Sequence, residues 1–70
     1  MLPLTLVQEG EESIIRRISG TDEVKNRLEA LGFVVGGTVI VVSRNGGNLI
    51  VNVKESRIAV DEKLAQKIMV

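Results

Sequence analysis

The first clear pattern of apolar and polar positions along the chain is helical. Apolar residues lie at Val24, Leu28 and Leu31, the spacing of one helical face, so the pattern predicts a helix over residues 23–31. The polar pair Thr21-Asp22 is suited to cap its start, because short polar side chains accept hydrogen bonds from the free N–H groups there. A helix this short is marginal alone in water, so its apolar face is expected to pack against the rest of the chain.

Four other runs alternate between apolar and polar residues or are rich in β-branched residues, which is typical of strands. They cover residues 12–19, 38–44, 48–54 and 57–60. In the first run, alternation places Ile15 on one face and Ile14 and Ile18 on the other. We expect this run to be a single half-buried strand.

The second and third runs are expected to form a hairpin. Asn45-Gly46-Gly47 separates them, and an Asn-Gly pair between two β-rich runs is a strong signal for a tight turn. Leu49, Val51 and Val53 alternate with other residues, so the second strand of the hairpin has one drier face. Short polar turns between apolar runs favour a compact small barrel.

A glycine-rich joint connects the predicted helix to this hairpin. Gly32 is placed to end the helix in a left-handed conformation, and Phe33 is then expected to fold back onto the helix face. Gly36-Gly37 follows directly before the β-branched run. The joint therefore predicts that the helix ends, the chain makes a tight turn, and a strand begins.

Both ends of the chain are apolar. Asp61 is a plausible N-cap for one helical turn over residues 62–66, and residues 68–70 then read as a short terminal strand. Leaving that strand exposed would cost free energy, so we expect it to pair with another strand. Leu4 and Val7 are candidates to pack nearby.

The length of the chain and its residue types limit the number of domains and the kinds of site that we expect. The chain has 70 residues, enough for one domain spanning residues 1–70. It lacks cysteine and histidine, which argues against a disulfide framework and against a tight zinc site. No cofactor is expected.

Charge and hydropathy limit the classes of partner and the cellular location that we expect for the protein. Nine basic and nine acidic residues cancel, and Phe33 is the single aromatic residue, so an RNA- or DNA-binding role is disfavoured. No stretch has the pattern of a signal peptide or the length of a membrane span, so we expect a cytoplasmic protein without direct membrane insertion. The oligomeric state is left open.

The glycines do not form a phosphate-binding loop, because no Gly-Lys-Ser/Thr follows and they precede strands or turns. Ser13 has no histidine to activate it as a nucleophile, so we do not expect an enzyme. The basic residues of the strands are most simply outward-facing charges, and the alternative is a local basic strip that acts as a binding site; these residues are Arg16, Arg17, Arg44, Lys54 and Arg57.

Two segments in this order are characteristic of a known family. Arg27-Leu28-Glu29-Ala30-Leu31-Gly32-Phe33 leads to Gly36, and Ala65-Gln66-Lys67-Ile68-Met69-Val70 ends the sequence. From Leu4 to Val70 the chain resembles the ferrous iron transport protein A (FeoA) family. It also resembles the C-terminal module of iron-dependent transcriptional repressors.

The resemblance implies a mostly β fold, a small SH3-like β-barrel with one short helix after the first strand and a helical turn before the last strand. It also implies a non-enzymatic accessory of ferrous iron uptake that contacts the cytosolic side of the membrane transporter FeoB, which carries a G-domain. The chain departs from the family at the end of the hairpin, where Glu55 occupies a position that often holds glycine.

Two hypotheses for a site follow. In the first, a groove beside the helix receives the partner, with Val24 and Leu28 as apolar contacts and Arg27 at its rim. In the second, the chain is a metal-responsive regulatory module that binds a divalent transition metal ion such as Fe²⁺ or Mn²⁺ through carboxylates, since these are oxygen ligands. The carboxylates proposed for that site are those of Glu11, Glu12 and Asp61.

Overall fold

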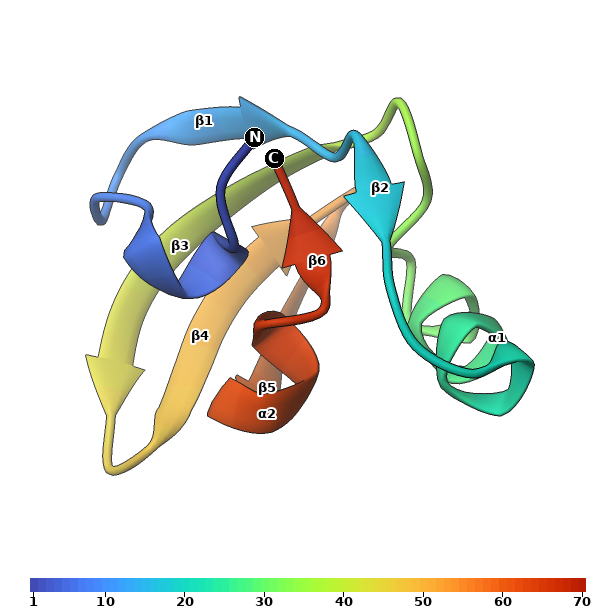
Figure 1. Cartoon of the computed structure of the whole chain (residues 1–70). Helices are drawn as coiled ribbons and strands as arrows, with labels where there is room; N and C mark the ends of the chain where they lie inside the picture. Colours follow the sequence, from blue (N-terminus) through green and yellow to red (C-terminus); the bar gives the residue numbers. More distant parts are fainter.

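A curved antiparallel sheet forms the body of the protein in the computed structural model, which describes residues 1–70. Its four strands lie in the order β1 (Glu12–Ile14), β3 (Thr38–Asn45), β4 (Asn48–Val53) and β5 (Ser56–Asp61). A two-stranded sheet pairs β2 (Arg17–Ile18) with β6 (Ile68–Met69). The helices are the 3₁₀ turn η1 (Leu4–Leu6), α1 (Asp22–Ala30) and α2 (Glu62–Ala65). Figure 1 shows α1 beyond β2, to one side of the curved sheet. The two sheets share no continuous ladder, so the barrel is an open one.

The predicted strand over residues 12–19 is wrong as a single element, because the chain changes sheets within it. Ile15 donates its N–H to the carbonyl of Gly37 beside β3, at 2.9 Å, whereas Arg16 donates to the carbonyl of Met69 in β6, at 2.8 Å. Ile15 is fully buried at this point and Ile14 is 51% exposed. Ile18, expected on the face of Ile14, instead packs against the core, because the bend rotates the second half of the run.

The hairpin is confirmed, with β3 and β4 as its strands. Gly46 and Gly47 form its two-residue loop, with φ angles of 56° and 85°, the left-handed values that a type I′ turn requires and glycine adopts freely. The alternation in β4 is also confirmed, since Leu49, Val51 and Val53 are all buried.

The end of the helix at Gly32 is confirmed. Thr21 caps α1, its hydroxyl accepting a hydrogen bond from the N–H of Val24, so the helix begins and ends one residue earlier than predicted. At the other end Gly32 has a φ of 107°, and its N–H donates to the carbonyl of Glu29. Phe33 donates to the carbonyl of Leu28, which completes a Schellman motif. The motif turns Phe33 into the core.

The two ends of the chain lie side by side, as Figure 1 shows. Leu2 and Val70 exchange backbone hydrogen bonds of 3.0 and 2.9 Å, and Pro3 forms a bridge with Met69. Leu4, Val7 and Ile68 are buried in one core. The expectation that the apolar C-terminus pairs with a strand and packs near the N-terminus is therefore confirmed.

Asp61 caps the helix that precedes the last strand. Its Oδ1 accepts a hydrogen bond of 2.7 Å from the N–H of Leu64. The helical turn covers Glu62–Ala65, with Gln66 as its C-cap, so the predicted turn is one residue too long.

Lys54, in the turn between β4 and β5, is the single non-glycine residue with a positive φ, at 56°. The position that favours glycine is therefore one residue before Glu55, where the family pattern suggests it. Because a left-handed conformation costs a non-glycine residue roughly 1 kcal/mol or more, we expect Lys54→Gly to raise the free energy of unfolding by about 0.5 kcal/mol after the entropy cost of glycine. Urea denaturation measures this change.

Glu55→Gly is the matched control for Lys54→Gly. Glu55 lies in the same turn without a positive φ, so glycine there adds only flexibility to the unfolded chain. We expect a loss of about 0.5 kcal/mol for this variant. The opposite ranking of the two variants would contradict the left-handed conformation of Lys54.

Candidate functional site

The three residues proposed for partner binding lie in different environments. Leu28 is 0% exposed and belongs to the core, so it presents no surface to a partner. Val24 is half-buried and packs against the same core. Arg27 is exposed to solvent. Val24 and Leu28 are thus the part of the predicted apolar stripe that packs against the core, and the burial of Leu28 contradicts its proposed place in a binding surface. Leu31, expected on the same face, is wrong as a packed residue, because it is the C-cap of α1 and 38% exposed.

A cleft does lie beside α1, with a volume of about 430 Å³. We call it the α1 cleft. Residues from β2 and the bend before it, from α1, and from the segment after the helix line it: Arg16, Arg17, Ile18, Lys25, Glu29, Phe33, Val34 and Val35.

The helix contributes Lys25 and Glu29 to the α1 cleft because residues four positions apart lie above one another on a helix. Arg27 is two positions from each of them, so it points to nearly the opposite side of α1. The groove beside the helix therefore exists, but on the flank of Lys25 and Glu29. The sequence pattern located the buried face of α1 and gave no information on which flank would border an open surface.

The charges of the α1 cleft are unbalanced. Three basic residues, Arg16, Arg17 and Lys25, face one acidic residue, Glu29, which gives the lining a net charge of +2 on a chain whose formal charge is zero. None of the four forms an ion pair, since the one ion pair of the structure joins Arg44 and Glu9. The cationic groups are free to bind an anionic partner.

The remaining wall of the α1 cleft is apolar. Phe33 is buried at its base, Ile18 and Val34 are half-buried, and Val35 is 65% exposed. The exposed valine sits beside Gly36, whose φ of 90° turns the chain back toward β3. This combination of an exposed aliphatic residue with neighbouring cations distinguishes the cleft from a purely polar surface.

A second groove, of about 420 Å³, runs along β1 and the N-terminal segment. We call it the N-terminal groove. Leu2, Leu6 and Ile14 are exposed in it, and its charged residues are Glu11, Glu12 and Arg16. Its charge is therefore mixed, with carboxylates in the majority.

The three carboxylates considered for a metal ion are not brought together. Glu12 is in β1 and Glu11 directly before it, whereas Asp61 ends β5, the strand at the opposite edge of the sheet. The Oδ1 atom of Asp61 already accepts the capping hydrogen bond of α2. No group of three or more His, Cys, Asp or Glu side chains suited to a metal ion occurs in the 70 residues.

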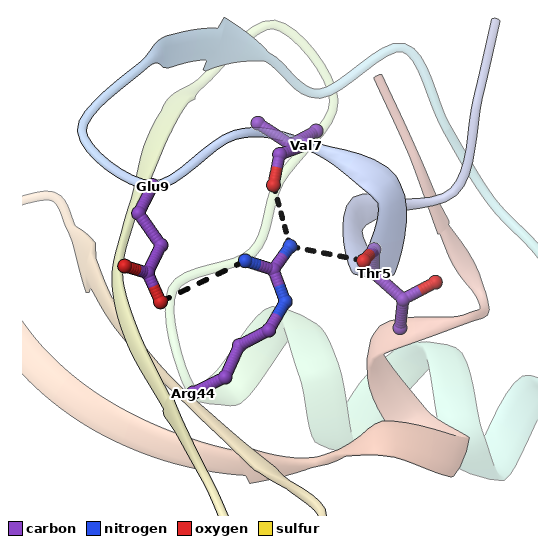
Figure 2. A network of polar contacts seen from close by, with 4 residues as sticks. All are labelled: Thr5, Val7, Glu9 and Arg44. Carbon is purple, nitrogen blue, oxygen red and sulfur yellow. Dashed lines mark hydrogen bonds and ion pairs between the residues drawn. The ribbon is translucent and has the colours of Figure 1, made fainter.

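Arg44 has a role that the sequence did not reveal. Figure 2 shows its guanidinium between the N-terminal turn and β3: Nη2 donates hydrogen bonds to the carbonyls of Thr5, at 2.9 Å, and of Val7. Nη1 lies 3.8 Å from the Glu9 carboxylate. The expectation that Arg44 is simply an outward-facing charge is therefore wrong. The side chain attaches η1 to the sheet.

We expect Arg44→Ala to lower the free energy of unfolding by about 1–2 kcal/mol, because hydrogen bonds from a charged group are worth more than neutral ones but this side chain remains 37% exposed. Chemical denaturation measures the change. Arg57→Ala is the control, since Arg57 makes a single exposed hydrogen bond, to Asn52. Equal effects in the two variants would contradict the role assigned to Arg44.

None of the helices has the length and the apolar composition of a membrane-spanning segment.

Comparison with known proteins gives one consistent family. The family described as "FeoA domain" matches residues 2–70. Fe(2+) transport protein A of Methanocaldococcus jannaschii is 37% identical over 70 residues, which cover 100% of this chain and 85% of that protein.

Solved structures show the same fold. FeoA of Stenotrophomonas maltophilia, solved with zinc and described as a prokaryotic SH3 domain protein, is 24% identical, with a TM-score of 0.84 over 99% of this chain and 88% of that one. A manganese-dependent transcriptional repressor is 19% identical, with a TM-score of 0.85 over 94% of this chain and 38% of the repressor. The SH3-like architecture expected from the sequence is confirmed, including its occurrence within a longer repressor.

Proposed function

The chain belongs to the FeoA family, and from that premise we propose that it is an accessory of ferrous iron uptake that acts by binding the cytosolic side of a FeoB-type transporter. The observation that carries the proposal is the family match over residues 2–70, reinforced by a relative that is 37% identical and named for Fe²⁺ transport. The match includes both ends of the fold as well as its hairpin and helix. A role in ferrous iron uptake follows from the family, and the transporter contact is the proposed mechanism.

The shape of the protein supports binding as that mechanism. The N-terminal groove and the α1 cleft, of about 420 and 430 Å³, are each lined by apolar and charged residues. Surfaces of this kind accept a short segment of another protein, with apolar contacts giving affinity and charges giving orientation. The proposal places the protein in the cytoplasm, where the G-domain of such a transporter lies.

Binding of the purified protein to the purified cytosolic G-domain of the transporter from the same organism tests the proposal. Biolayer interferometry with and without guanine nucleotide is expected to show saturable binding in at least one nucleotide state. An FeoB lacking its G-domain serves as the control and is expected not to bind. Absence of binding in every nucleotide state would contradict the proposed contact.

Iron uptake in cells provides the second measurement. Deleting the gene is expected to lower uptake of radioactive ⁵⁵Fe²⁺ under anaerobic conditions, and a plasmid copy is expected to restore it. Uptake unchanged by the deletion would contradict the accessory role itself rather than only the contact.

A further inference from the structure

The lining of the α1 cleft is more basic than the protein as a whole. Its lining has a net charge of +2, while the whole chain has a formal charge of zero. Arg16, Arg17 and Lys25 are exposed and have no acidic partner within ion-pair distance. Like charges gathered without partners repel one another, so an anionic group placed among them lowers the free energy of the complex.

The apolar part of the cleft determines what kind of anion fits. Val35, which is 65% exposed, lines the same cleft as the cations, and the half-buried Ile18 and Val34 add to its apolar wall. A small inorganic anion would leave this wall in contact with water. A peptide segment that carries an aliphatic side chain next to carboxylates would cover the wall and pair the cations at the same time.

The two grooves also differ in their charge. The N-terminal groove contains Glu11 and Glu12 against Arg16 alone, so an acidic segment would be repelled there. The α1 cleft has the opposite balance, with Glu29 as its single acid. An acidic segment is therefore expected to bind the α1 cleft in preference to the N-terminal groove, although the two are similar in size.

We infer that the α1 cleft is the docking site for an acidic segment of the partner protein, with an aliphatic residue against Val35 and carboxylates against Arg17 and Lys25. The identity of that partner as a FeoB-type transporter rests on the proposed function. The chemistry of the segment rests on the cleft alone.

Charge reversal tests the electrostatic part. The double variant Arg17→Glu/Lys25→Glu is expected to weaken binding of the transporter G-domain about tenfold at low salt, with a smaller difference at high salt because exposed charges are screened. The matched control is Arg57→Glu/Lys63→Glu, which makes the same change of charge on β5 and α2, away from the cleft. Circular dichroism establishes that both variants are folded. Equal affinities of the two variants would overturn the inference while leaving the proposed function intact.

A second pair of variants tests the apolar part. Val35→Ser is expected to weaken binding several-fold, because it removes an exposed aliphatic contact without disturbing the core. Ile14→Ser removes an exposed aliphatic residue from the N-terminal groove and is expected to leave the affinity unchanged. The reverse result would assign the docking site to the N-terminal groove and overturn the inference.

A synthetic peptide separates this inference from the proposed function. The probe is a short peptide in which Glu and Leu alternate, and the comparison peptide has Lys in place of Glu. In ¹H–¹⁵N NMR spectra the acidic peptide is expected to shift the amide signals of Arg17, Lys25 and Val35, and the basic peptide is not. Absence of shifts at the cleft with the acidic peptide would overturn the inference whether or not the transporter binds. Cleft shifts without any binding of the G-domain would retain the inference and contradict the proposed partner.

Discussion

Replacing Phe33 with alanine is expected to lower the free energy of unfolding by about 3–5 kcal/mol, the usual cost of truncating a buried aromatic side chain. Phe33 is the only aromatic residue, the largest fully buried side chain, and 0% exposed. A domain of 70 residues has a total stability of roughly 4–10 kcal/mol, so the variant loses a large part of it. The rest of the core is aliphatic, and no second ring is present to fill the space.

Urea denaturation followed by circular dichroism measures the effect, which is expected as a much lower midpoint with an unchanged slope. Val35→Ala is the control, since Val35 lies two residues later in the same segment but is largely exposed. We expect the control to change stability by less than about 0.5 kcal/mol. A Phe33→Ala protein as stable as this control would contradict the burial of the ring in the core.

Leu28→Asp is expected to unfold the protein. The side chain of Leu28 is fully buried, and its loss alone costs about 2–5 kcal/mol. A carboxylate at that position would add the cost of burying a charge without a partner, which comes to several kcal/mol more. The sum is comparable to the whole stability of a domain of this size.

Arg27→Asp is the matched control for Leu28→Asp, because it introduces the same residue one position earlier on α1 at an exposed site. Its expected cost is below about 1 kcal/mol, from helix propensity and the unfavourable charge near the end of the helix. Far-ultraviolet circular dichroism distinguishes the two variants. A folded Leu28→Asp protein would show that this face of α1 can open, and would restore Leu28 as a candidate contact residue.

Much of the fold was predictable because its signals are local. The Thr21 cap, the Gly32 and Phe33 motif and the Asp61 cap each depend on residues within five positions of one another. The Gly46-Gly47 turn is also local, and the alternation in β4 follows from strand geometry. For these elements the prediction was wrong by at most a residue at a helix end.

The remaining features depend on segments that are distant in sequence. The chain bends between Ile15 and Arg16 because the N–H of Ile15 donates to Gly37, directly before β3, whereas the N–H of Arg16 donates to Met69 in β6. Nothing within the run specifies that change of partner. Arg44 binds carbonyls 37 and 39 residues away, and backbone acceptors leave no trace in side-chain patterns.

The candidate site was predicted only in part for the same reason. Periodicity placed Val24 and Leu28 correctly on the packed side of α1, but it also placed the exposed Leu31 there. It gave no information on how the other sides of the helix lie relative to β2. The orientation of the helix brings Lys25 and Glu29 beside Arg17 and leaves Arg27 on the other side. A cleft therefore lies beside the helix, but none of Val24, Arg27 and Leu28 lines it.

The hydrogen bonds between Leu2 and Val70 make the backbone almost a closed ring. A short linker from the last residue to the first would complete that ring, and the chain could then be opened elsewhere without rerouting any strand. The Gly46-Gly47 turn is the natural place, since it is exposed and a Cβ atom at either glycine would meet nothing within 4 Å. A circularly permuted protein that begins at Gly47 would keep every sheet partner and present its two new ends at the tip of the hairpin.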